Sequence, residues 1–199
     1  MPRPCEFDRD EVLHRAMEVF WRQGYEATGM PDLLQAMGIG RQSLYNAFES
    51  KRGLFLEALQ AYQAQRAAAM QRLLAGSASP LAGIEALMLA LAAAPAAARA
   101  RGCMSVNAAA ELGDKDEEVA AILRDGAQTS KAAMADAVAR ARTQGELPAG
   151  LDAPAAADFL MTLMRGLRVG ARAGAGAAEA RNAVALALAA LRHRPSSTG

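Results

Sequence analysis

The chain has 199 residues, which is enough to bury a sizeable core in one or two small domains without covalent staples. Its 22 Lys+Arg residues are balanced by 21 Asp+Glu residues, so it lacks the strongly basic field of a nonspecific nucleic-acid coat protein. The two cysteines, Cys5 and Cys103, lack the paired spacing of a disulfide framework or a zinc site, so we expect no metal, no cofactor and a reducing cytoplasm.

Membrane insertion is not expected from the sequence. No charged-then-apolar leader pattern opens the chain, and the longest uncharged run, residues 86–98, contains Pro95. That run is also shorter than the roughly 18 to 20 residues that a spanning helix needs. We therefore expect a soluble protein with no membrane partner.

The first part of the chain predicts three helices, at residues 8–23, 30–37 and 41–47. Asp8, Asp10 and Glu11 suit the positive end of the first helix, and Gly24 ends it. A short "GIG" step, residues 38–40, separates the second helix from the third. Two short helices joined by a glycine-containing turn and braced by a third form a helix-turn-helix unit.

The third predicted helix presents hydrogen-bonding side chains on its outer side. Leu44 and Phe48 are spaced i, i+4 and are expected to point inward. The residues left outside are Arg41, Gln42, Ser43, Tyr45 and Asn46. Arg pairs well with guanine and Gln or Asn with adenine, while Ser or Tyr can donate to phosphates, so this face suits a DNA major groove.

Residues 8–62 resemble the N-terminal domain of the TetR family of one-component transcriptional repressors. The resemblance rests on the order of "GY..T", "DL..A.GI" and "LY..F.SK..L" within "AMEVFWRQGYEATGMPDLLQAMGIGRQSLYNAFESKRGLFLEAL". It implies an all-helical homodimer that reads a palindromic double-stranded DNA operator and is released by a small-molecule effector. Carried over by position, Thr28, Tyr45 and Lys51 are expected to contact phosphates, and Arg41, Gln42, Ser43 and Asn46 to contact bases.

Three positions depart from the family pattern. Gly29 and Gly40 stand where capping side chains are frequent, and Ala47 replaces a frequent aromatic residue or histidine. Glycine costs only a few tenths of a kcal/mol relative to a capping side chain, so we expect the fold to survive with one phosphate contact fewer. Arg3, in the N-terminal tail, is a candidate for a further DNA contact, with a disordered tail as the alternative.

The rest of the chain is rich in alanine and predicts an all-α bundle. Expected helices cover residues 51–74, 84–93, 97–112, 117–143, 154–173 and 178–192, with a loop at 75–83. We expect a helix-turn-helix domain at residues 1–52 and a ligand-binding and dimerisation domain at residues 53–199. The last two helices carry apolar stripes for which a dimer interface is expected, with an intrachain core as the alternative: Leu160, Met164, Leu167, Val184, Leu188 and Leu191.

The effector pocket is expected to be apolar and pliable, because methionine adapts to varied ligands. Its candidate residues are Met88, Cys103, Met104, Asn107 and Met134. Cys103 could sense electrophiles or oxidants, with a buried structural thiol as the alternative. Few charged residues are available to select an ionic effector, so a small apolar or reactive compound is expected.

Two other classes of function were weighed. An enzyme is disfavoured, because His14 and His193 are the only histidines and no nucleophile motif or phosphate loop is present. The acidic residues Glu111, Asp114 and Asp116 are interpreted as a solvated turn. A helical dimeric scaffold that does not bind DNA is the remaining alternative.

Overall fold

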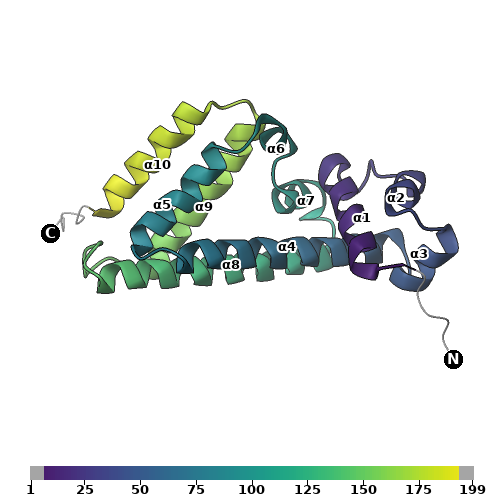
Figure 1. Cartoon of the computed structure of the whole chain (residues 1–199), viewed down its shortest axis with the longest axis horizontal. Coiled ribbons are helices and arrows are strands. Elements are labelled where there is room, and N and C mark those ends of the chain that lie inside the picture. The colour runs from purple at the N-terminus through teal and green to yellow at the C-terminus, as the bar shows by residue number, and fades with distance from the viewer. Residues whose placement is uncertain (1–6, 193–199) are drawn as a thin grey trace. The chain divides into compact units, whose positions relative to one another are not determined.

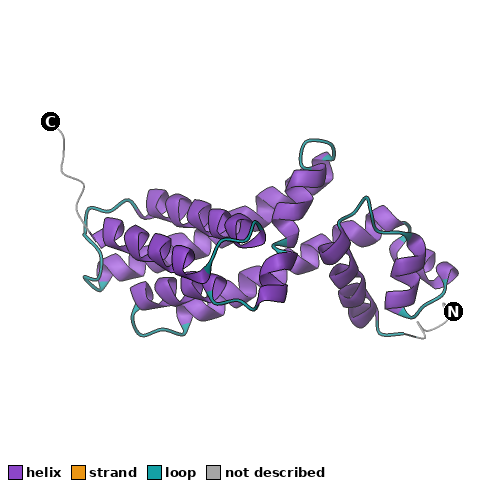
Figure 2. Cartoon of the chain, turned by 90° about the horizontal axis from the view of Figure 1, so that it is seen from above, coloured by secondary structure: helices purple, strands orange, loops and turns teal. Residues whose placement is uncertain are grey.

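The computed structural model describes residues 7–192 and contains ten α-helices and no strand within that range (Figures 1 and 2). The helices are α1 Arg9–Gln23, α2 Met30–Met37, α3 Arg41–Phe48, α4 Lys51–Ala75, α5 Pro80–Ala92, α6 Ala96–Arg101, α7 Met104–Leu112, α8 Glu117–Thr143, α9 Ala153–Arg172 and α10 Ala177–Arg192. The all-α prediction, with an N-terminal helix-turn-helix and a C-terminal helical region, is therefore confirmed.

Two of the expected helix boundaries are wrong. Residues 75–83 were expected to form a loop, but α5 begins at Pro80, because Ser79 accepts the Ala82 N–H and a proline is favourable in a first helical turn. The single helix expected at 97–112 is divided into α6 and α7. Gly102 breaks it with a φ of 69°, a left-handed conformation that side chains other than glycine rarely adopt.

The chain divides into two compact units. The first comprises the residues up to Gln65 together with Cys103–Gly126, and the second comprises Arg66–Gly102 together with the residues from Ala127 onward. Both α4 and α8 therefore contribute residues to each unit. The first unit includes a segment, α7 and the start of α8, that lies about fifty residues beyond the predicted helix-turn-helix domain in the sequence.

Aromatic and aliphatic side chains fill the core of the first unit. The rings of Phe20 and Phe55 meet edge to face at 5.1 Å, and Tyr25 packs on Phe55 at 4.9 Å. Burying each such side chain contributes roughly 1.5–3 kcal/mol. Leu33 and Leu44 are fully buried in the same core, so it directly fixes α2 and α3 against α1.

Smaller side chains build the second unit. Its core takes methionine, leucine and alanine from α4, α5, α8, α9 and α10, and α5 lies beside both α9 and α10 (Figure 1). Arg140 of α8 donates to the carbonyl of Leu74 at 3.0 Å, which satisfies a C-terminal carbonyl of α4.

Apolar helices were also compared with the length of a bilayer. In residues 7–192 no single helix combines the length and hydrophobicity that a membrane span requires. The helical residues 80–91 and 96–112 are long and apolar enough for a membrane span only when taken together, and they are bent by 86° relative to each other.

Candidate nucleic-acid interface

The turn between α2 and α3 depends on two glycines with different roles. Gly38 ends α2 with a φ of 69° and ψ of 26°, and its N–H donates to the carbonyl of Leu34 at 3.0 Å. Only glycine adopts this left-handed cap without a steric penalty. Gly40 begins α3 in an extended conformation without a side-chain cap. Together they set α3 at an abrupt angle to α2, as a helix-turn-helix requires.

Helix α3 is held by one face and presents the other. Leu44 and Phe48 are buried, whereas Arg41, Gln42, Tyr45 and Asn46 are exposed. The amide of Gln42 donates to Asn46 Oδ1 at 3.0 Å, so these two side chains form a pair along the exposed face. Ser43 is half-buried.

The start of α4 offers a further cationic and N–H-rich surface. Ser50 Oγ accepts the Gly53 N–H at 2.9 Å, so Ser50 caps the N-terminus of α4. The ammonium group of Lys51 lies 4.4 Å from the centre of the Tyr25 ring, a cation–π contact that restrains the lysine. Burial raises the pKa of Tyr25.

The buried position of Thr28 argues against the side-chain phosphate contact expected from the resemblance. Its side chain is 1% exposed, and its hydroxyl donates to the carbonyl of Gly24 at 2.5 Å. A hydroxyl committed to a buried backbone acceptor is not presented to a phosphate. Thr28 therefore holds the turn between α1 and α2, and we leave its side chain out of the DNA contacts proposed below.

Arg9 ties the start of α1 to α3 and α4. Its guanidinium pairs with Glu57 at 2.8 Å, donates to the carbonyl of Ala47 at 3.2 Å and lies 4.6 Å from the centre of the Phe48 ring. A planar guanidinium can make all three contacts at once. Arg9 thus braces the carboxyl end of α3, a role that the sequence interpretation missed.

A second set of contacts holds α1 and α4 to the segment that contains α7. Glu111 accepts the N–H groups of Tyr25 and Glu26 at 2.9 Å and 2.7 Å. A carboxylate that accepts two backbone N–H groups makes charge-assisted bonds, which are stronger than neutral ones. The turn between α1 and α2 is thereby joined to α7.

Arg52 makes the matching contact at the start of α4. Its guanidinium binds both carboxylate oxygens of Asp116, at 2.9 Å and 3.0 Å, and one oxygen of Glu118 at 2.9 Å. The hydrogen bond to Asp116 raises the pKa of Arg52, and the same bond lowers the pKa of Asp116. The interpretation of this acidic cluster as a solvated turn is therefore wrong for Glu111 and Asp116. Asp116 accepts the N–H groups of Glu118 and Val119 and so caps the start of α8. The run of an aspartate and two glutamates at this helix start could have predicted the cap from the sequence.

The predicted effector residues belong to two different units. Met88 and Met134 are buried in the core of the second unit, whereas Cys103 and Met104 are buried in the core of the first. Asn107 is half-buried on α7. Cys103 precedes α7 and receives the hydroxyl hydrogen bond of Tyr62 at 3.4 Å. This burial favours the structural alternative for Cys103, and the sensor role remains a hypothesis.

The predicted dimer stripe also lies in a core. Five of its residues are at most 6% exposed and pack within the second unit: Leu160, Met164, Val184, Leu188 and Leu191. Leu167 is half-buried against the same core. This burial favours the intrachain alternative for the stripe, because side chains of α5 and α8 share the same core. The large apolar side chains left exposed on α9 and α10 are Phe159, Val169 and Leu186.

Between residues 7 and 192 no three His, Cys, Asp or Glu side chains gather as metal ligands would.

Comparison with known proteins places the chain among bacterial transcriptional regulators. Residues 12–58 match the family "Bacterial regulatory proteins, tetR family", and residues 80–187 match "Tetracyclin repressor-like, C-terminal domain". An uncharacterized HTH-type transcriptional regulator of Bacillus subtilis, YezE, is 39% identical over 148 residues, which cover 74% of this chain and 76% of YezE. The HTH-type transcriptional repressor ComR of Escherichia coli is 30% identical over 175 residues, covering 87% of this chain and 83% of ComR.

A solved structure resembles the chain over nearly its full length. It contains a cysteine-substituted variant of the TetR family transcriptional regulator CifR in complex with a 26 bp double-strand operator DNA. The sequence identity is 34% and the TM-score 0.80, with 95% of this chain and 99% of the CifR chain covered.

Proposed function

This chain belongs to the TetR family of DNA-binding transcriptional regulators, and on that basis we propose that it is a homodimeric repressor which a small-molecule effector releases from a palindromic operator. Repression is supported by the similarity to ComR, which is named a repressor. We further propose that it acts in the cytoplasm, where it meets chromosomal DNA.

The exposed face of α3 is the observation that carries the proposal. Arg41, Gln42, Ser43 and Asn46 would read base edges in the major groove, and their positions are set by the buried Leu44 and Phe48. Arginine and amide side chains make bidentate bonds to guanine and adenine, respectively. The existing bond between Gln42 and Asn46 would orient both amides before DNA is bound.

Phosphate contacts would flank this face. Tyr45 is 40% exposed on α3, and Lys51 stands at the N-terminal end of α4. A helix N-terminus and a lysine both favour an anion. We propose that Tyr45 and Lys51 fix the register of α3 on the duplex, because phosphate contacts position a protein without reading sequence.

Homodimer formation would use the exposed side of α9 and α10. Phe159, Val169 and Leu186 are 45%, 53% and 73% exposed, and a second copy would cover them. The helix-turn-helix units of the two copies would then contact DNA half-sites about 34–36 Å apart, or at a comparable spacing. We propose this exposed face as the dimer interface in place of the buried stripe that the sequence periodicity indicated.

Effector release requires a ligand that binds the two conformations of the protein with different affinity. Helix α4 contributes residues to both units, so it is the covalent connection through which such a change would reach α3. The contacts of Glu111 and Arg52 would serve the same purpose, because they tie α7 and the start of α8 to α1 and α4.

Substitution of Arg41 tests the proposal. We expect Arg41→Ala to weaken binding to the DNA upstream of the protein's own gene by about 1–3 kcal/mol while leaving the thermal unfolding temperature unchanged. Fluorescence anisotropy with a labelled duplex would measure this at two salt concentrations. Arg72→Ala, which removes an exposed arginine on α4, is the matched control and should bind as the wild type does.

The alternative, a helical scaffold that does not bind DNA, makes the opposite prediction. A wild-type affinity that does not fall with added salt, and that Arg41→Ala leaves unaltered, would favour it. Specific binding of DNA loses affinity steeply with salt, because bound phosphates release counterions.

A further inference from the structure

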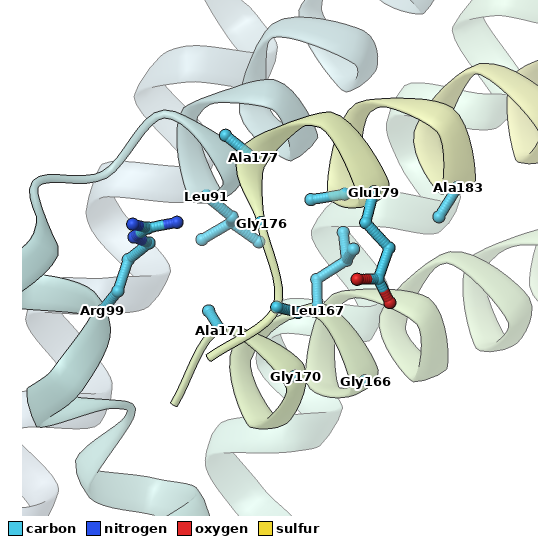
Figure 3. Close-up of a pocket in the computed structure, with 12 residues that line it drawn as sticks. Leu91, Arg99, Gly166, Leu167, Gly170, Ala171, Gly176, Ala177, Glu179 and Ala183 are labelled. Carbon is cyan, nitrogen blue, oxygen red and sulfur yellow. The ribbon is translucent and has the colours of Figure 1, made fainter. Parts of the chain in front are cut away.

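A cavity lies in the second unit where α6, α9 and α10 come together (Figure 3). Its volume is about 90 Å³, and about 450 Å³ when the solvent space at its open mouth is included. None of the residues predicted to bind an effector lines it.

The walls are almost entirely apolar or backbone. Leu91 of α5 forms one side, and Ala183 of α10 forms another (Figure 3). Glycine 166 and glycine 170 expose the backbone of α9. Two charged side chains line the cavity, Arg99 from α6 and Glu179 from α10 (Figure 3).

Arg99, a half-buried residue, has one buried nitrogen without an acceptor. Its Nε is buried and has no hydrogen-bond partner within the described residues. The guanidinium of Arg99 points toward the cavity (Figure 3). A buried donor attached to a charged group is costly to leave unpaired, so an acceptor from outside the chain would stabilise it. Glu179, by contrast, is exposed and is solvated by water.

The glycines in α9 are not explained by packing inside the chain. A Cβ at Gly166 would meet nothing within 4 Å, and a Cβ at Gly170 would make an ordinary 3.5 Å contact with Ala175. Each glycine in the middle of a helix costs about 0.5–1 kcal/mol relative to alanine. Glycine at these two positions keeps the cavity open, because the Cβ of an alanine at either position would project into it.

We propose that this cavity binds the effector, and that the effector is a small carboxylate with an apolar body. Its carboxylate would pair with Arg99, and its body would lie against Leu91, Ala183 and the exposed backbone of α9. This inference deepens the proposed function and rests on it. It also changes the expected chemistry, because an apolar or reactive effector without a charge leaves Arg99 unpaired.

Calorimetric titration of the full-length protein without DNA tests the site. The probe is octanoate, and octanamide is its neutral control of the same length. We expect octanoate to bind at least about tenfold more tightly, which is the contribution of a charge-assisted hydrogen bond. Equal affinities, or no binding by either compound, would overturn the proposal.

Three variants locate the site. Arg99→Gln is expected to remove the tenfold preference for octanoate, and Ala183→Phe is expected to abolish binding by filling the cavity. Arg181→Gln, on α10 but outside the cavity, is the control and should retain it. Thermal unfolding of each variant checks that it folds. Unchanged octanoate affinity in both Arg99→Gln and Ala183→Phe would show that the carboxylate binds elsewhere.

Operator binding with and without octanoate separates this proposal from the proposed function. Loss of DNA binding on addition of octanoate, absent in Arg99→Gln, supports both. If octanoate binds at Arg99 but the protein binds no DNA, the cavity assignment stands and the repressor proposal fails. If the protein binds DNA but octanoate does not bind, the repressor proposal stands and the cavity assignment fails.

Discussion

A single hydroxyl group holds the loop between α1 and α2. Gly24 ends α1 with a φ of 84°, and the Thr28 hydroxyl satisfies the carbonyl of Gly24 in a buried position. The same loop receives the carboxylate of Glu111, which lies 2.8 Å from where a Cβ at position 24 would stand. A larger residue at position 24 would displace Glu111 as well as strain the backbone.

Replacement of Thr28 separates a structural role from a role in binding phosphate. We expect Thr28→Val to destabilise the fold by about 1–3 kcal/mol, because it leaves a buried carbonyl without a donor. The slope of operator affinity against salt should not change. Thr143→Val is the matched control, since Thr143 makes the same bond to the carbonyl of Ala139 in an exposed position. Urea unfolding and DNA titrations over a salt range measure both effects, and a smaller salt slope for Thr28→Val would restore the phosphate contact.

At the level of elements, α7 and the start of α8 determine how firmly α1 and α4 are held. Glu111 accepts backbone N–H groups just after the end of α1, and Arg52 at the start of α4 binds Asp116. The hydroxyl of Tyr62 on α4 donates to Cys103 Sγ, and Gln63 Oε1 on α4 accepts the hydroxyl of Ser105. The three-helix domain expected at residues 1–52 is thus part of a larger unit.

The pairing of Asp116 with Arg52 predicts a dependence of stability on pH. The pKa of Asp116 is lowered in the folded chain, chiefly by the Arg52 hydrogen bond. The pairing therefore stabilises the fold fully above the ordinary aspartate pKa of about 4, and this contribution disappears as the pH falls through the lower folded-state value. Asp116→Asn, which preserves the helix cap, should be less stable than the wild type at pH 7, and the difference should shrink as the pH falls below about 4.

Urea unfolding at several pH values measures this difference. Asp114→Asn, which alters an exposed neighbouring aspartate, is the control and should follow the wild type at every pH. A stability difference for Asp116→Asn that is the same at pH 7 and near pH 2 would contradict the assignment.

For the molecule as a whole, the proposed homodimer depends on the exposed face of α9 and α10, which would join the helix-turn-helix units of two copies. Phe159→Glu is expected to convert the dimer into a monomer, because a charged side chain cannot be buried at an apolar contact without a partner. Light scattering measures the mass, and DNA titration should show a loss of operator affinity. Leu73→Glu changes an apolar residue of similar exposure, 49% against 45%, on α4 and should leave the dimer intact. A dimeric Phe159→Glu protein would place the interface elsewhere.

The sequence by itself determined the helical class and the exposed face of α3. Both depend on local information, because helix propensity, the i, i+4 spacing of Leu44 and Phe48 and the glycines at 38 and 40 act within a few residues. The resemblance, which also rests on local order, indicated the family. That family is confirmed by the matches of both halves of the chain.

Only the tertiary structure decided which apolar stripes become core. Leu160 and Leu188 have the same periodicity whether their partner is α5 of the same chain or a helix of a second chain, so spacing could not distinguish the two. The partners of Glu111 and Arg52 were equally hidden. Glu111 lies 86 residues from Tyr25, and Asp116 lies 64 residues from Arg52. Contacts over such separations exist only after the chain has folded, and no local pattern encodes them.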